Sequence, residues 1–161
     1  MKKKELAQTN GDVTISYRGN VSIKGIDIKT GQVTKRIQKH NTGKVAFFEL
    51  IAQSIAGNNV TSLMPRYLRG FNGNESTISS FIPYNSPILS KTETNASVSF
   101  EFLIPYTQLS TTLYTTKLCL YNSTTSSATV FADIELGDDK KFKSDGNTNY
   151  LVTWTIVIGN A

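Results

Sequence analysis

Short stretches of alternating apolar and polar residues recur along this chain, and they constrain its fold more than any other feature. The alternation is cleanest at residues 96–104 and most apolar at residues 149–158. A period of two residues is typical of a β-strand that buries one face. Turn-forming residues separate the stretches, so the pattern predicts a mainly β protein, an antiparallel β-sandwich of jelly-roll or immunoglobulin-like type.

Further strands are predicted on the same grounds. They cover residues 12–17, 21–28, 33–37, 67–71, 113–121 and 128–136. We expect a turn at residues 18–20, a hairpin turn at 29–32 and a charged, mobile hairpin tip at 137–147. The phase of the alternation slips at Gly25, which indicates a β-bulge.

The period changes only once, at Thr42, where apolar residues begin to recur at helical spacing. Gly57 follows the last of them, and glycine commonly ends a helix. The sequence therefore predicts one short α-helix near residues 43–56, with its apolar face packed on a sheet. The predicted core combines two residues of this helix with one phase of the strands: Phe47, Ile51, Val98, Phe100, Phe102, Ile104, Val130, Ile134, Val152 and Ile156.

Length and charge predict one domain with an N-terminal arm. A chain of 161 residues is typical of a single compact domain. Residues 1–44 hold ten Lys and Arg against three acidic residues, a net charge of +7, whereas residues 45–161 have a net charge of −2. We therefore expect a basic arm at 1–11 and a single β-sandwich domain at 12–161, which includes a basic β-meander at 12–38.

Such a charge asymmetry favours contact between the basic segment and a negatively charged partner. The partner is either DNA or the acidic face of a neighbouring protein subunit. The alternative is a solvated basic surface, in which lysines prevent edge strands from pairing with other chains. The candidate partner-contact residues are Lys2, Lys3, Lys4, Lys24, Lys35, Arg36 and Lys39.

Few residues could carry chemistry. Cys119 and His40 are the only cysteine and histidine, so no intramolecular disulfide can form and a structural zinc site lacks ligands. Nothing in the sequence links these two residues, and Asp133 and Glu135 are interpreted as the solvent side of one strand. We expect a protein that is not an enzyme, with no catalytic, cofactor-binding or metal-ligating residues and no cofactor. No run of about 18 apolar residues is present, so we expect no membrane contact.

Two parts of the sequence resemble small structural proteins of tailed bacteriophages. The first is KHNTGKVAFFELIAQSIAGN at residues 39–58, followed by Pro-Arg-Tyr at 65–67. In such proteins, a basic hairpin leads through a turn of asparagine, a small residue and glycine into a short apolar helix and then a strand that begins near a Pro-Arg or Pro-Lys pair. The second part is the C-terminal half, from residues 116–122 through residues 152–156, which is similar to sandwich strands of phage virion components.

This resemblance implies a non-enzymatic structural subunit that assembles in the host cytoplasm and resides in the virion. Its implied partners are copies of itself and other capsid, neck or tail proteins. The position in the particle stays open.

Two alternatives of other classes remain. One is a carbohydrate- or receptor-binding sandwich, for which Tyr106, Tyr114 and Tyr121 are candidate contact residues if they are exposed rather than packed at the rim. The other is a basic nucleic-acid-binding module. It is supported by the charge of the N-terminal segment, but Tyr17 is the only aromatic residue there that could stack on a base.

Overall fold

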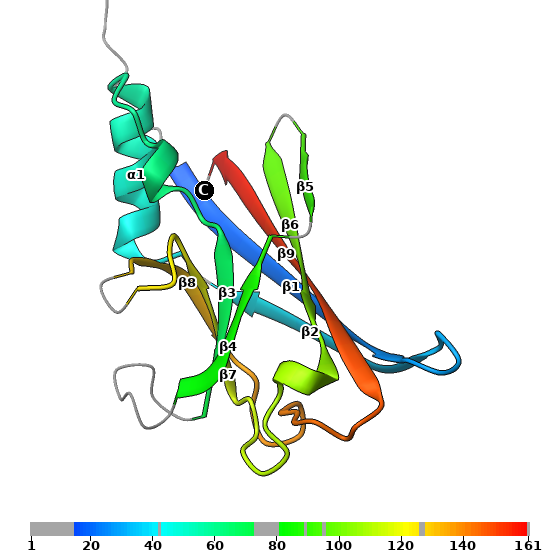
Figure 1. Cartoon of the computed structure of the whole chain (residues 1–161). Helices are drawn as coiled ribbons and strands as arrows, with labels where there is room; N and C mark the ends of the chain where they lie inside the picture. The colour runs from blue at the N-terminus through cyan, green and yellow to red at the C-terminus, as the bar shows by residue number, and fades with distance from the viewer. Residues whose placement is uncertain are drawn as a thin grey trace, which may run out of the picture.

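The computed structural model describes residues 15–41, 43–72, 81–88, 90–94, 96–125 and 128–160. The predicted arm at 1–11, with Lys2, Lys3 and Lys4, lies outside the described residues. Within them the chain forms two antiparallel sheets and one short helix, which confirms the predicted mainly β sandwich (Figure 1).

The larger sheet has five strands in the order β2-β1-β9-β6-β5, and the smaller has four in the order β4-β3-β7-β8. Every neighbouring pair in both sheets is antiparallel. The strands are β1 (Ile15–Asp27), β2 (Val33–Asn41), β3 (Tyr67–Phe71), β4 (Phe81–Pro87), β5 (Ser90–Glu93), β6 (Ser97–Ile104), β7 (Lys117–Tyr121), β8 (Val130–Glu135) and β9 (Thr148–Asn160). Two short 3₁₀ turns occupy Thr61–Leu63 and Tyr106–Gln108.

The first strand differs from the sequence prediction. No turn occurs at residues 18–20, because β1 continues without a break from Ile15 to Asp27 and pairs with β9 along this whole length. Gly19 occupies an inward position of the strand, opposite Asn41, and leaves room for the side chains of Asn41 and Tyr17. The predicted bulge is confirmed, since the register between β1 and β2 shifts at Gly25.

The core lies between the two sheets and includes Trp154, which is fully buried in β9. Seven of the ten predicted core residues are buried there: Phe47, Phe100, Phe102, Ile104, Ile134, Val152 and Ile156. Ile51 and Val98 are half-buried against this core, whereas Val130 packs against a second cluster. That cluster contains Phe71, Cys119 and Tyr121 on the outer face of the four-stranded sheet.

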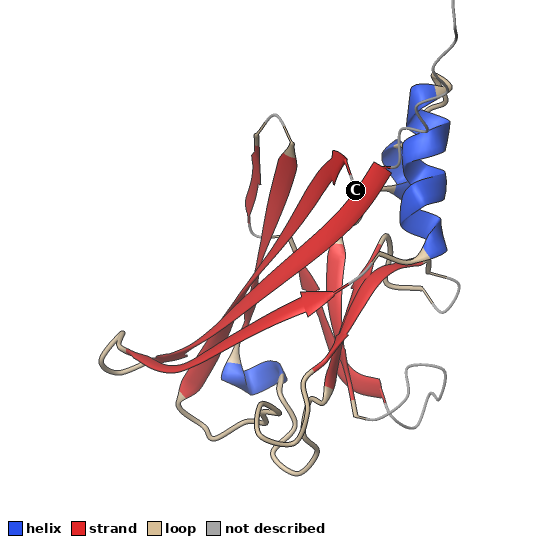
Figure 2. Ribbon diagram, turned by 180° about the vertical axis from the view of Figure 1, so that it is seen from behind, coloured by secondary structure: helices blue, strands red, loops and turns tan. Residues whose placement is uncertain are grey.

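Helix α1 (Val45–Ile55) confirms the predicted helix and stands at the edge of the molecule, beside the start of β1 (Figures 1 and 2). Its N-terminus is fixed by the preceding residues, because Gly43 bridges Ala132 of β8 and the Lys44 amide donates to the Phe131 carbonyl at 2.9 Å. Phe47 is buried, with its ring 4.6 Å from that of Tyr17. Only one side of the helix is packed in this way, so the expectation that its whole apolar face is buried is wrong.

Candidate interaction surfaces

The hairpin formed by β1 and β2 carries four of the predicted partner-contact cations, and its register sets the face of each. Ile23 and Ile37 are directly paired and buried, so the neighbouring pair, Lys24 and Arg36, points to the outer face of the five-stranded sheet. Lys24 is half-buried and Arg36 is exposed. Among the described residues, no carboxylate forms an ion pair with either of them.

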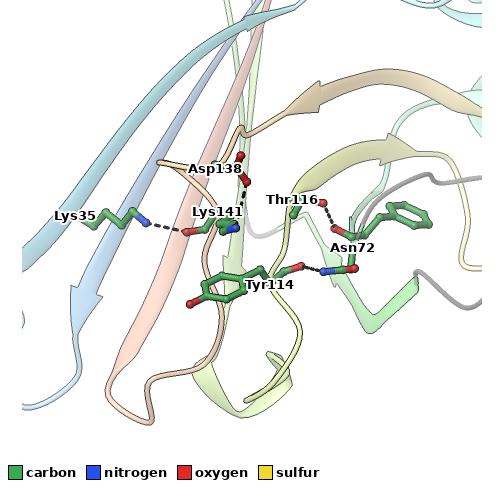
Figure 3. A network of polar contacts seen from close by, with 7 residues as sticks. Lys35, Asn72, Tyr114, Thr116, Asp138 and Lys141 are labelled. Atoms are coloured by element: carbon green, nitrogen blue, oxygen red, sulfur yellow. Dashed lines mark hydrogen bonds and ion pairs between the residues drawn. The ribbon is translucent and has the colours of Figure 1, made fainter.

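The other two cations, Lys35 and Lys39, share the phase of Ile37 and therefore lie on the inner side of the same strand. The Lys35 ammonium donates a hydrogen bond to the Lys141 carbonyl at 3.0 Å, across the seam between the sheets (Figure 3). Lys39 lines a groove beside β8. The structure thus brings Lys24 and Arg36 together and separates them from Lys35 and Lys39.

The loop at 137–147 is held in place at several points, which corrects the expectation of a mobile charged tip. Lys35 binds its backbone, and the Lys141 ammonium lies 3.2 Å from Asp138 Oδ1 (Figure 3). The Lys141 and Lys143 ammonium groups lie 5.0 and 4.9 Å from the centre of the Tyr114 ring. These contacts make the loop part of the folded end of the sandwich.

A groove of about 480 Å³ lies where β2 approaches β8, and it is lined by Lys39, His40, Asn41, Asp133, Ile134 and Glu135. Asp133 Oδ2 lies 2.9 Å from the Lys44 ammonium and 3.1 Å from that of Lys117, which also pairs with Glu135 at 3.1 Å. Burial raises the pKa of Asp133, but the hydrogen bonds and charges of Lys44 and Lys117 outweigh it and hold the pKa below its ordinary value.

This ion-pair network was not predicted from the sequence, which indicated Asp133 and Glu135 only as a solvent-facing pair. The Asp133 side chain is 19% exposed because Lys117, on the neighbouring strand, covers it. Lys117 and Cys119 lie on the same face of β7, as the alternation of residues along the strand indicates. This alternation was the one sequence signal for the position of Lys117. Without the register of β7 and β8, the pairing could not be assigned.

The histidine and the cysteine lie in different sheets. His40 is exposed in β2, where its Nδ1 lies 2.6 Å from Asn20 Oδ1. Cys119 is fully buried in β7, opposite Arg69 of β3 and Asp133 of β8. The structure therefore does not bring the two residues together.

The outer face of the five-stranded sheet carries small polar side chains that hydrogen-bond across the strands. Ser99 of β6 lies 2.7 Å from Thr155 of β9, measured between hydroxyl oxygens. Ser90 of β5 donates to Glu101 of β6 at 2.6 Å. Similarly, Gln38 donates to Ser22 at 2.9 Å. These cross-strand pairs give the face a polar, hydroxyl-rich character.

The three tyrosines considered for sugar binding have different surroundings. Tyr121 is buried beneath the Arg69 guanidinium, 4.4 Å from its ring centre, so it is not available to a ligand. Tyr114 is exposed but is flanked by the two lysines of the 137–147 loop. Tyr106 lines an open depression of about 510 Å³, together with Thr107, Leu109, Thr111, Ser144, Asp145 and Gly146.

The described part of the chain contains no group of three or more His, Cys, Asp and Glu side chains placed to hold a metal ion. Within the same part, no helix has the length and apolar character needed to cross a bilayer. No protein-family model, curated protein or solved structure matches the chain in the comparisons with known proteins.

Proposed function

We propose that the protein is a non-enzymatic structural subunit of a bacteriophage virion. In this role it associates with copies of itself and docks onto neighbouring capsid, neck or tail proteins. The proposal is supported by the resemblance of residues 39–58 to phage structural proteins and by the surfaces described above. It places the protein in the virion after assembly in the host cytoplasm.

One observation carries the docking part of the proposal: Lys24 and Arg36 are directly opposed on an exposed face. Like charges opposite each other on adjacent strands destabilise a sheet. The hairpin at residues 15–41 holds six cations and one acidic residue, so it does not compensate the pair internally. An acidic face of a neighbouring subunit would supply the missing negative charge and relieve this repulsion.

The outer face around this pair suits contact with another protein. Its serine, threonine and glutamine side chains are already hydrogen-bonded to one another, as in the Ser99–Thr155 and Gln38–Ser22 pairs. A surface that is ordered before contact loses less conformational freedom when a partner binds. Positive charge then steers an acidic partner towards the face and favours the correct orientation.

Incorporation into particles tests this function. The double variant Lys24→Glu, Arg36→Glu, produced during phage growth in place of the natural chain, should be excluded from purified particles. A matched control, Lys91→Glu with Lys140→Glu, changes the same charge outside the hairpin and should be incorporated normally. Normal incorporation of the first variant would contradict docking through this pair, and absence of the natural chain from particles would contradict a virion role.

DNA is the other negatively charged partner that the hairpin could contact. Its binding would show as retention of the protein on immobilised DNA that falls steeply as salt rises, because binding releases cations from the phosphates and this release becomes less favourable at higher salt. If the protein fails to bind DNA even at low salt but does bind virion proteins, the result favours an acidic subunit as the partner.

Sugar binding is a second candidate function, and the depression beside Tyr106 favours it. The depression combines an aromatic ring with hydroxyls of Thr107 and Ser144. However, the Asp145 carboxylate there is already occupied by the Thr148 hydroxyl and by the backbone amides of Asn147 and Thr148. A glycan array comparing the natural chain with Tyr106→Ala tests it: a glycan bound by the natural chain alone would support this function, and no bound glycan would exclude it.

A further inference from the structure

Helix α1 has a second apolar side that stays partly or largely exposed in the part of the chain that the structure describes. Val45 is 73% exposed, Phe48 40% and Ile55 75%, and Ala52 between them is also exposed. We call these four residues the outer stripe. Their spacing of three, four and three residues places them along one side of the helix, as in the seam of a coiled coil.

The position of the helix makes the outer stripe accessible. Phe47, Leu50 and Ile51 pack towards the core, whereas α1 itself stands at the edge of the molecule in both views (Figures 1 and 2). A contiguous exposed apolar surface commonly marks a contact with another protein. Among the described residues, the packing accounts for the inner residues of α1 and reaches the outer stripe at Phe48, whose ring centre lies 6.4 Å from that of Tyr17 and 5.8 Å from that of Phe47.

We propose that the outer stripe is a self-association surface, occupied by the outer stripe of a second copy in antiparallel orientation. This inference rests on the proposed function and names the surface for its self-association. The residue order supports it, because antiparallel pairing about position 50 places Val45 opposite Ile55 and Phe48 opposite Ala52. A large ring then meets a small side chain in each central layer, which favours close packing.

Parallel pairing would be less complementary. It would place Phe48 against Phe48 and Ala52 against Ala52, giving one crowded layer and one gap. A two-fold arrangement, in which the same patch of each copy faces the other, is the commonest symmetry of protein dimers. The antiparallel order is therefore the one that the sequence of the stripe favours.

Charge permits a second copy at this surface but does not attract one. The chain carries a net charge of +5, so copies repel one another over the basic hairpin. Helix α1 contains no lysine or arginine, and Glu49 is its only charged residue. The stripe is thus an apolar surface at which two cationic copies can approach. Glu49 flanks it one position from the centre of symmetry, so antiparallel pairing brings two Glu49 side chains near each other.

The contact should be weak between two free copies and stronger within an assembly. A helix of 11 residues is about 16 Å long, which limits the area that two of them can bury. Stable interfaces bury about 1,200–2,000 Å² in total. Additional contacts within a particle raise the effective concentration and strengthen a weak pair.

Disulfide trapping tests the geometry directly in the full-length chain. Val45→Cys and Ile55→Cys are produced separately and oxidised mildly, each alone and as an equal mixture. Antiparallel pairing predicts a mixed disulfide dimer in the mixture and several-fold less dimer in either variant alone. Dimers that form equally in each variant alone would contradict the antiparallel order, and the absence of dimers in all three samples would overturn the proposal.

Sedimentation equilibrium supplies the second test. Ile55→Ser should reduce the dimer fraction several-fold, whereas Leu113→Ser, which removes an exposed leucine elsewhere, should leave it unchanged. Glu49→Gln should raise the dimer fraction because it removes the repulsion between the two carboxylates. A natural chain that stays monomeric at all concentrations, or an Ile55→Ser variant that dimerises normally, would overturn the inference.

The two proposals can fail separately. If Ile55→Ser enters particles as efficiently as the natural chain and dimerises normally, the surface assignment is wrong while the virion role stands. If the purified chain forms the trapped antiparallel dimer but is absent from particles, the self-association surface stands while the virion role is wrong.

Discussion

Gly19 is the position where the smallest side chain matters most. The Asn41 side chain and the Tyr17 hydroxyl lie next to it, and the buried Trp154 indole nitrogen is in turn close to the Tyr17 hydroxyl. Burial raises the pKa of Tyr17, and this effect exceeds the opposite influence of its contacts with Trp154 and Asn41. A methyl group on Gly19 would overlap Asn41 Oδ1 and crowd the Tyr17 hydroxyl.

We therefore expect Gly19→Ala to lower the free energy of unfolding by about 1–3 kcal/mol, the usual cost of overpacking. Gly159→Ala is the matched control in the same sheet, because nothing lies within 4 Å of its added methyl group. Urea denaturation of both variants measures the difference. Equal stability of the two variants would show that Asn41 moves aside without cost.

Asp133 makes stability depend on acid pH. Because its pKa in the folded chain lies below the ordinary carboxyl value of 3.8, ionised Asp133 stabilises the fold above that pH. This contribution is lost as the pH falls through the folded-state pKa. We expect the natural chain to lose stability below about pH 4 more steeply than Asp133→Asn.

Thermal unfolding from pH 2 to 7 measures this dependence. Glu93→Gln is the control, because the Glu93 side chain is largely exposed and its ammonium partner, Lys91, is 3.5 Å away. The control should follow the natural chain across the range. Parallel curves for the natural chain and Asp133→Asn would contradict the assigned role of the ion-pair network.

The hairpin of β1 and β2 places two like charges directly opposite each other. Lys24 and Arg36 repel each other, so Lys24→Glu should convert a repulsive pair into an attractive one. We expect the variant to be more stable than the natural chain by about 0.2–1 kcal/mol. Chemical denaturation measures the change. A less stable variant would show that Lys24 has a favourable contact in the folded chain.

Alternation predicted most of the elements because each strand buries one face. It located β6, β8 and β9, and a single change of period located α1. The Gly25 bulge was visible as a slip in the same alternation. These features depend on local patterns, which a sequence shows directly.

Other features depended on contacts between distant residues. Gly19 resembles a turn residue, but its inward position opposite Asn41 is set by the pairing of β1 with β2. Likewise, Tyr121 is buried because Arg69 crosses its ring and donates to the carbonyls of Ser123 and Thr125. The hydrogen bond from the candidate cation Lys35 to the Lys141 carbonyl could not be predicted either, because it depends on how the two sheets are arranged.

Three surfaces of the molecule differ in charge and polarity. The β1–β2 hairpin is basic, the outer face of the five-stranded sheet is polar, and the outer stripe of α1 is apolar. Contacts through the exposed cations should weaken as salt rises, since charges are screened over about 8–10 Å at physiological ionic strength. Contacts through the outer stripe should not, because apolar burial does not depend on charge.

Deletion of residues 1–11 tests the contribution of the basic arm. We expect the truncated chain to unfold at nearly the same temperature as the full-length chain but to enter particles poorly. The reason is that Lys2, Lys3 and Lys4 precede every strand and the helix that form the core. Thermal unfolding and the composition of purified particles measure the two effects. Normal incorporation of the truncated chain would show that the arm is dispensable.

We propose that this chain is a structural part of a virion, and the number of copies in purified particles is the decisive measurement of that role. Quantitative mass spectrometry of particles purified from cells that express this coding sequence during phage growth measures the copies per particle. We predict several copies, in the same number in independent preparations, as expected for a symmetric assembly. Absence of the chain, or traces that vary between preparations, would contradict the claim.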